Sequence, residues 1–143
     1  MTRFLNRLEI SGRSLVLLLG VGLVVLFAAR PVAAVAKGGP PVEVRVAGVC
    51  GSGATSKLRL RSRGGVIDVR FELDHGRAGE IWRVVLVHER RVGWNGFAKT
   101  TRPGGSFEVE RTLSDLPGAD EVTVRAWGPR GLVCGAVATL PDA

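Results

Sequence analysis

Apolar and polar residues alternate with a period of two along most of the chain after residue 41. The segments VEVRV (42–46), KLRLR (57–61) and VIDVRFELD (66–74) each place apolar side chains on one side and charged side chains on the other. Because successive side chains of a β-strand point to opposite faces of its sheet, this alternation predicts half-buried strands with one face in water. Five further segments are expected to be strands: 81–89, 91–101, 106–113, 121–127 and 132–140.

Turn-forming sequences separate these segments. RSRGG, DHGRAG, RPGGS, SDLPGAD and GPRG are rich in Gly, Pro, Asp and Ser, the residues that favour tight turns. No segment after residue 36 has the pattern of an amphipathic helix. The sequence therefore predicts an all-β fold: an antiparallel sandwich of about 7–8 strands in immunoglobulin or fibronectin type III style, after an N-terminal hydrophobic helix. A small β-barrel is the alternative, since the same period fits both folds.

Two strand registers follow from matching charges across adjacent segments. A two-residue loop at positions 63–64 is expected to place Arg59 opposite Asp68 on the solvent side. The next pair of segments is expected to place Leu73 opposite Trp82, with Trp82 in the core of a central strand. Both registers pair apolar residues with apolar residues.

The first 36 residues have a different character. Arginines at positions 3, 7 and 13 precede the uncharged run SLVLLLGVGLVVLFAA (14–29), and small residues follow at 34–36. This pattern is typical of a secretory signal peptide cleaved after Ala36. The alternative is an uncleaved membrane anchor, although the apolar run is shorter than the ~20 residues that a spanning helix requires. Basic residues before the run place the rest of the chain outside the cytoplasm in both cases.

The predicted organisation is therefore a signal peptide at 1–36, a flexible lead-in at 37–41 and a β-sandwich domain at 42–140. We expect the domain to be extracellular or at the cell surface, either secreted or anchored and facing outward.

The two cysteines favour a disulfide. Cys50 follows the first predicted strand, and Cys134 lies in the last one, 84 positions later. Both have the parity of the apolar face, and an exported chain with two cysteines usually pairs them. The closed loop would stabilise the fold by roughly 4–5 kcal/mol on the chain-entropy model. A zinc site or a redox motif is not predicted, because no histidine is close to either cysteine and no Cys-x-x-Cys is present.

The chain resembles the small exported β-sandwich proteins of unassigned function that are common in actinobacteria. The resemblance rests on the predicted signal peptide, Cys50, Trp82, the block GGSFEVERTLSDLPGAD (104–120) and Cys134. It implies a single extracellular domain with one disulfide. It assigns no active-site residues.

One candidate contact patch centres on Trp94. Gly93 and Gly96 flank this tryptophan in an irregular segment, where a strand glycine predicts a bulge, and Arg90 and Arg91 precede it. An aromatic ring beside arginines can stack on a sugar, a base or a peptide. The alternative is that Trp94 packs on the sheet or covers an edge.

A second candidate is a basic stripe. Lys57, Arg59, Arg61 and Arg63 share one face of a predicted strand, and such a stripe can follow an anionic polymer. Acidic residues of the neighbouring segment would neutralise it if they lay close by. Residues 37–143 contain 16 Arg and Lys against 12 Asp and Glu, which is a moderate excess. No aromatic residues interleave with the stripe, so specific nucleic-acid recognition is not expected.

No arrangement of residues predicts catalysis. Ser52 in CGSGA lacks the strand-to-helix turn of a nucleophile elbow. His75 and His88, with Asp74 and Glu89 beside them, would form a metal site only if their two loops met. We therefore expect a non-enzymatic module without a cofactor or metal.

The expected role is binding or structural, at the cell envelope. Its expected partner is an envelope polymer or an extracellular protein, and it would contact a membrane only through an uncleaved N-terminal segment. The alternatives are a binder of anionic polymers through the basic stripe, or a small secreted enzyme or inhibitor.

Overall fold

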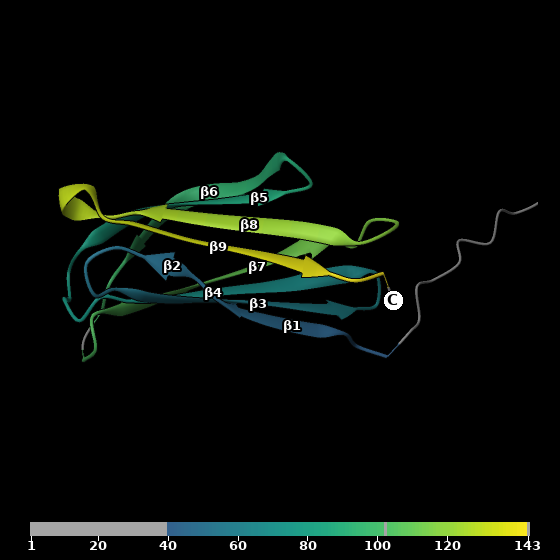
Figure 1. The fold of residues 1–143 in the computed structure, drawn as a ribbon, viewed down its shortest axis with the longest axis horizontal. Coiled ribbons are helices and arrows are strands. Elements are labelled where there is room, and N and C mark those ends of the chain that lie inside the picture. Colours follow the sequence, from purple (N-terminus) through teal and green to yellow (C-terminus); the bar gives the residue numbers. More distant parts are fainter. Residues whose placement is uncertain (1–39, 102, 143) are drawn as a thin grey trace, which may run out of the picture. The chain divides into compact units, whose positions relative to one another are not determined.

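The computed structural model describes residues 40–101 and 103–142 (Figure 1). The predicted signal peptide at 1–36 lies outside the described residues. The elements are β1 (Glu43–Ala47), β2 (Val49–Cys50), β3 (Thr55–Arg63), β4 (Val66–Asp74), β5 (Ile81–His88), β6 (Arg91–Lys99), β7 (Ser106–Ser114), β8 (Asp120–Trp127), the 3₁₀ turn η1 (Pro129–Gly131) and β9 (Val133–Leu140). In this part of the chain, no helix is long and apolar enough to cross a membrane.

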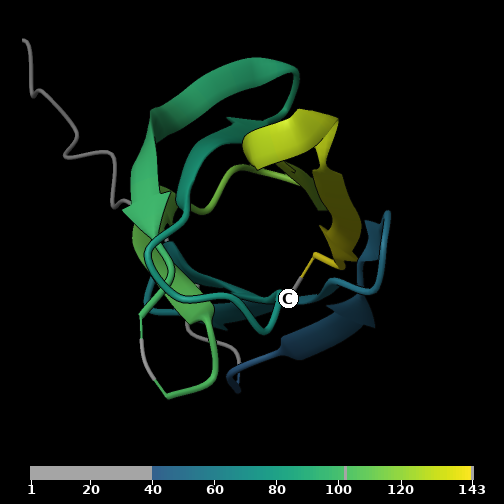
Figure 2. The ribbon, with the colours of Figure 1, turned by 90° about the vertical axis from the view of Figure 1, so that its left-hand side faces the viewer.

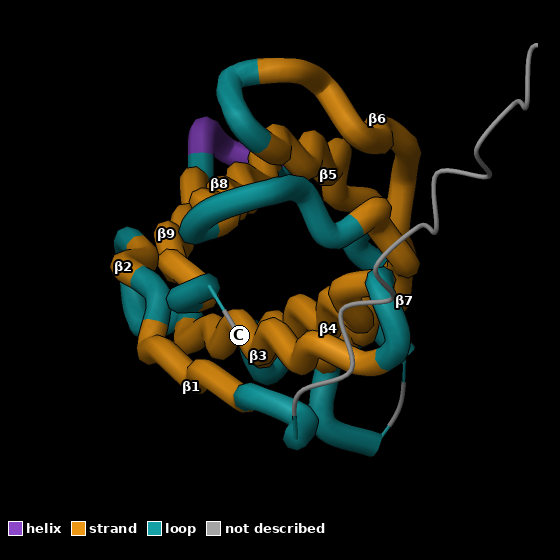
Figure 3. The backbone as a smooth tube through the Cα atoms, turned by 90° about the vertical axis from the view of Figure 1, so that its right-hand side faces the viewer, coloured by secondary structure: helices purple, strands orange, loops and turns teal. Residues whose placement is uncertain are grey.

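The strands form two antiparallel sheets that pack face to face. Sheet A has the order β1-β3-β4-β7, and sheet B has the order β2-β9-β8-β5-β6. Views along the strands from either end show the two sheets on opposite sides of one core (Figures 2 and 3). The predicted all-β antiparallel sandwich is confirmed. The described residues do not form the alternative closed barrel, because no ladder joins the two sheets.

The apolar positions predicted from alternation face the core. Leu58, Leu60, Phe71 and Trp82 are each at most 1% exposed, and burial of such side chains is the main driving force of folding. Trp82 is a core residue, as predicted. Other fully buried side chains from both sheets belong to the same core cluster: Ile67, Leu73, Val84, Leu86, Val122, Val124 and Leu140.

The chain changes sheet at Gly48, between β1 and β2. A Cβ atom at this position would lie 2.1 Å from Ser56 Oγ and 2.8 Å from the carbonyl oxygen of Gly135, so only glycine fits. Because of this crossing, β2 joins the edge of sheet B and Cys50 lies directly opposite Cys134 of β9. The two cysteines form a disulfide, as predicted. A disulfide is consistent with an oxidising compartment outside the cytoplasm.

The first predicted register is wrong by two residues. Arg63 pairs with Val66, so the turn consists of Gly64 and Gly65 and Arg59 lies opposite Arg70 instead of Asp68. Gly64 and Gly65 both have positive φ, 61° and 81°, and a two-residue turn of this type needs positive φ at both central positions. The side chains still face the predicted sides, because a shift of two residues preserves the alternation.

The second predicted register is also wrong. Leu73 of β4 lies opposite Phe107 of β7, and Trp82 of β5 lies opposite Ala98 of β6. The loop at 75–80 carries the chain from sheet A to sheet B. Six residues easily span the ~10 Å between packed sheets, so this loop does not enforce a hairpin. If β1 and β2 are counted as one strand that crosses between the sheets, the second and third strands are β3 and β4, and both lie in sheet A. In the immunoglobulin arrangement, the second and third strands lie in different sheets.

Candidate functional site

The outer face of sheet B, which we call the apolar face, exposes an unusual set of side chains. Eight large apolar residues are exposed in the described part of the chain, and all except Leu116 lie on this face. Val49 is 83% exposed and Phe97 74%. The others are Ile81, Val92, Trp127, Val133 and Val137. Exposed apolar side chains gathered on one face, rather than scattered, mark a contact surface.

Two of the strands, β5 and β9, contribute several valines to the apolar face because their sequences do not alternate strictly. The segments IWRVVLVH of β5 and VCGAVATL of β9 are nearly continuous apolar runs. Val85, Val87, Val133 and Val137 therefore point outward while their neighbours fill the core. Continuous runs of this kind are typical of strands that are covered on both faces. That signal was present in the sequence, but the interpretation of every strand as having one wet face missed it.

Cations accompany the apolar side chains. Arg83, Arg125 and Lys99 occupy outward positions on β5, β8 and β6, and Glu121 is the one carboxylate at an outward strand position of sheet B. The Arg83 guanidinium carbon lies 5.9 Å from the centre of the Trp127 ring, within cation–π range. A hollow of about 350 Å³ lies on this face, lined by Val85, Val87, Arg90, Glu121, Thr123, Arg125 and Trp127. The apolar face is thus both hydrophobic and positively charged.

The outer face of sheet A, which we call the charged face, has the opposite composition. Its outward strand positions carry the cations Arg45, Lys57, Arg59, Arg61, Arg63 and Arg70 and the acids Glu43, Asp68, Glu72, Asp74, Glu108 and Glu110. Most of the cations lie on β1 and β3, and most of the acids lie on β4 and β7. The charged face therefore has a basic half and an acidic half.

The basic stripe of β3 is neutralised at one end and open at the other. Arg63 Nη2 lies 3.5 Å from Asp68 Oδ2, and Arg61 lies opposite both Glu43 and Asp68. Within residues 40–101 and 103–142, neither Lys57 nor Arg59 has an ion-pair partner. The neighbouring acids thus reach the Arg63 end of the stripe, as considered from the sequence. At the other end, Lys57 lies opposite Glu72 without forming an ion pair, and Arg59 lies between Arg45 and Arg70.

The structure does not gather Trp94, Arg90 and Arg91 into one patch. Trp94 is half-buried on the core side of β6, beside the bulge that the ladder confirms at Gly93. The Arg111 guanidinium carbon lies 4.0 Å from the centre of its ring. Arg90 and Arg91 line a separate hollow of about 420 Å³ with His88, Glu89, Gly93, Leu116, Pro117 and Ala119. Trp94 therefore covers a sandwich edge, and Arg111 already contacts its ring.

No protein-family model, curated protein or solved structure matches this chain.

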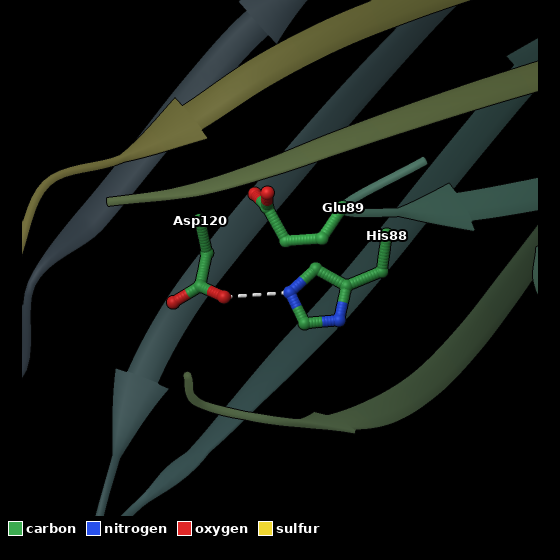
Figure 4. A group of neighbouring side chains, drawn as sticks. All are labelled: His88, Glu89 and Asp120. Carbon is green, nitrogen blue, oxygen red and sulfur yellow. Dashed lines mark hydrogen bonds and ion pairs between the residues drawn. The ribbon is translucent and has the colours of Figure 1, made fainter. Parts of the chain in front are cut away.

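One group of side chains has donors that suit a metal ion. His88, Glu89 and Asp120 each offer a ligand atom, and these atoms lie within 4.8 Å of one another (Figure 4). Imidazole and carboxylate groups together suit zinc and similar ions. In this structure, however, His88 Nε2 donates to Asp120 Oδ1 over 2.6 Å, and Glu89 Oε1 accepts the backbone N–H of Glu121 over 2.7 Å. Each of these groups therefore holds together one end of the sandwich.

A second histidine–carboxylate pair closes the opposite end of β5. Glu80 Oε2 lies 2.6 Å from His75 Nδ1, and Glu80 Oε1 accepts a hydrogen bond from Arg130 over 2.6 Å. The hydrogen bond from Arg130, with a smaller contribution from His75, lowers the pKa of Glu80. The ring of His75 meets Trp82 edge-on at 5.8 Å. The two histidines therefore lie at opposite ends of β5 and do not form a shared metal site.

Proposed function

We propose that this chain is a non-catalytic extracellular module that adheres to an anionic membrane surface through its apolar face. The observation that carries the proposal is the concentration of exposed apolar side chains on the outer face of sheet B, together with Arg83, Arg125 and Lys99. Apolar contact and attraction to anionic lipids act together at membrane interfaces.

The side-chain chemistry of the apolar face suits the headgroup region of a bilayer. Tryptophan rings such as that of Trp127 are enriched at the level of the headgroups, and phenylalanines such as Phe97 are common on the apolar faces of interfacial elements. Arginine and lysine can lay their apolar stems along such a surface and keep their charges in water. Each cation near an anionic bilayer contributes about 1 kcal/mol.

A second copy of this chain fits the apolar face less well. Face-to-face packing of two copies would bury Arg83 and Arg125 twice, with only Glu121 of each copy as a carboxylate on the face. Burial of cations without partners is costly. An anionic surface supplies the missing negative charge, which favours it over self-association.

The predicted export agrees with this location. A signal peptide or an outward-facing anchor at 1–36 would deliver the domain to the outer side of a membrane, and the Cys50–Cys134 disulfide is consistent with that compartment. The resemblance to small exported β-sandwich proteins points the same way. The absence of catalysis stays a prediction, supported by the engagement of His88, Glu89 and Asp120 in structural hydrogen bonds.

Co-sedimentation with vesicles tests the proposal. The exported form of the chain should bind vesicles rich in phosphatidylglycerol much more strongly than vesicles of phosphatidylcholine. Phe97→Glu should weaken binding about tenfold, because it removes an apolar contact and adds a negative charge. Ser114→Glu is the matched control, because it adds the same charge at an exposed position of the charged face, opposite the uncharged Val66.

Equal binding to both kinds of vesicle, or equal losses in the two variants, would overturn the proposal. Sedimentation equilibrium adds a second criterion. A concentration-dependent dimer that Phe97→Glu abolishes would assign the apolar face to a second copy instead of a membrane. Both variants change exposed side chains, so each should retain the melting temperature of the wild type to within a few degrees.

A further inference from the structure

Three arginines lie side by side across the charged face. Arg45 of β1 is directly opposite Arg59 of β3, which is directly opposite Arg70 of β4. Like charges in directly opposite positions of an antiparallel sheet are destabilising. The fold thus places three cations in one row, an arrangement that a bound anion would stabilise.

A hollow of about 350 Å³ lies beside this row. Ala47, opposite Lys57, has a short side chain, and this leaves space at the surface. The charged side chains that line the hollow are Arg45, Lys57, Arg59, Arg70 and Glu72. The volume is large enough for a small oxyanion, and the four cations of the lining outnumber its one carboxylate.

Two of the four cations are fixed and two are free. Arg45 is held by Glu43, with 2.5 Å between Nε and Oε1, and Arg70 is held by Glu108 and Glu110 at 2.9 and 2.6 Å. In the part of the chain that the structure describes, Lys57 and Arg59 have no ion-pair partner. The fixed pairs form the walls of the hollow, and the free side chains can turn toward a ligand.

We propose that this hollow binds a phosphate group, either as a free anion or as part of an anionic polymer. Arginine presents a planar fork of donors that matches the oxygens of a phosphate, and lysine adds a mobile point charge. The site is on the opposite face of the sandwich from the apolar face, so it does not depend on the proposed membrane contact. Of the basic stripe predicted from the sequence, only Lys57 and Arg59 belong to this site. Arg45 and Arg70 of the neighbouring strands complete it.

Thermal unfolding in phosphate and in chloride at equal ionic strength tests this site. A ligand that binds only the folded state raises the melting temperature, so the wild type should melt several degrees higher in phosphate. Arg59→Gln should lose this phosphate-specific rise. In chloride at low ionic strength, Arg59→Gln should melt no lower than the wild type, because it removes the middle charge of the arginine row.

Arg63→Gln is the matched control. It removes an equal charge from the same strand at a position that Asp68 neutralises, so it should keep the phosphate-specific rise. An equal rise in Arg59→Gln and the wild type would overturn the proposal. A wild-type melting temperature that is the same in phosphate and in chloride would also overturn the proposal, because any stabilisation by salt would then reflect charge screening alone.

Isothermal titration with inorganic phosphate and with long-chain polyphosphate distinguishes the two sources of the ligand. Polyphosphate binding that is more than tenfold tighter per site, with a steep dependence on salt, would identify a polymer. Comparable affinities would identify the free anion. In either case Lys57→Gln and Arg59→Gln should each weaken binding about tenfold, as expected for the loss of a charge-assisted contact. Binding of neither probe would overturn the site.

Discussion

The two sheets have similar inner faces and very different outer faces. Both inner faces are mainly apolar and mostly buried. The charged face of sheet A presents arginines and carboxylates in a basic half and an acidic half, whereas the apolar face of sheet B presents mainly valines, aromatic residues and arginines. Folding of a sandwich requires only the inner faces to be apolar. The composition of the apolar face is therefore not needed for the fold, and it is the best guide to function.

The edge strands of sheet B are a second guide to how this sheet makes contacts. Sheet B ends in β2, which has only two residues, and in β6, which contains the bulge at Gly93. Short edge strands and bulges prevent two sheets from pairing edge to edge. Sheet B thus has protected edges and an open face, which favours contact through the face.

The largest expected effect comes from the disulfide at the β2 edge. Replacing Cys50 and Cys134 by serine should lower the free energy of unfolding by about 4.5 kcal/mol on the chain-entropy model, because the open loop gains conformational freedom in the unfolded state. Urea denaturation of both forms measures this loss. A loss below about 1 kcal/mol would contradict the prediction, since it would lie within the range of an ordinary point mutation.

The same variant tests whether the two sheets depend equally on the disulfide. The first strand of sheet A pairs through five residues of β1, whereas β2 has two pairs and the disulfide. Amide hydrogen exchange by global unfolding should rise in every strand of the serine variant, because the whole fold loses stability, and β2 should show an additional rise from local opening of its two-residue ladder. A rise in β2 no larger than the rise in β1 and β3 would show that the disulfide acts only through the unfolded state and does not hold the sheet B edge.

Alternation in the sequence predicted what depends on local geometry. The strand positions, the core residues and the pairing of Cys50 with Cys134 followed from side-chain parity, which is fixed within each strand. The registers failed because turn geometry and packing of the core, and not charge matching, determine them: the observed pairs are the like-charged Arg59–Arg70 and the apolar Leu73–Phe107. Assignment of β4 and β5 to different sheets depends on long-range packing, which no local pattern records.

The candidate sites divided in the same way. The basic stripe on β3 was visible as a sequence pattern, but its open end at Arg59 depends on Arg45 and Arg70 from neighbouring strands. The apolar face is assembled from β2, β5, β6, β8 and β9, so no single segment contains it. The runs in β5 and β9 were its only local signal.

The hairpin turns of the two sheets also differ, and this difference predicts a smaller change in stability than loss of the disulfide. Gly64 and Gly65 form the turn in sheet A, whereas Glu89 and Arg90 form the turn in sheet B with φ of 47° and 63°. A left-handed conformation costs a non-glycine residue roughly 1–2 kcal/mol, and glycine loses about 0.5–1 kcal/mol more backbone entropy on folding. Arg90→Gly should therefore stabilise the domain by about 0.5–1 kcal/mol, as measured by urea denaturation.

Arg91→Gly is the control for this variant. It removes the same charge one residue later, within β6, where φ is not positive, so it should lower stability. Glu89 stays unchanged in both variants because its carboxylate accepts the backbone N–H of Glu121. If both glycine variants lost stability to the same extent, the turn in sheet B would not be strained.

The smallest expected effect is the loss of stability in acid. It distinguishes the contribution of Glu80, which closes one end of the sandwich, from that of the exposed carboxylates of the charged face. Hydrogen bonds from Arg130 and His75 lower the pKa of Glu80. The unfolded chain therefore takes up this proton first, and the stability that Glu80 contributes is present above its ordinary pKa of about 4.3 and is lost as the pH falls through the lowered value. Glu80→Gln should lower the melting temperature at pH 7 and flatten its decline as the pH falls below about 4.3. Glu108→Gln, which removes an exposed carboxylate of the charged face, should keep most of that decline, whereas equal flattening in both variants would place the acid response on the charged face.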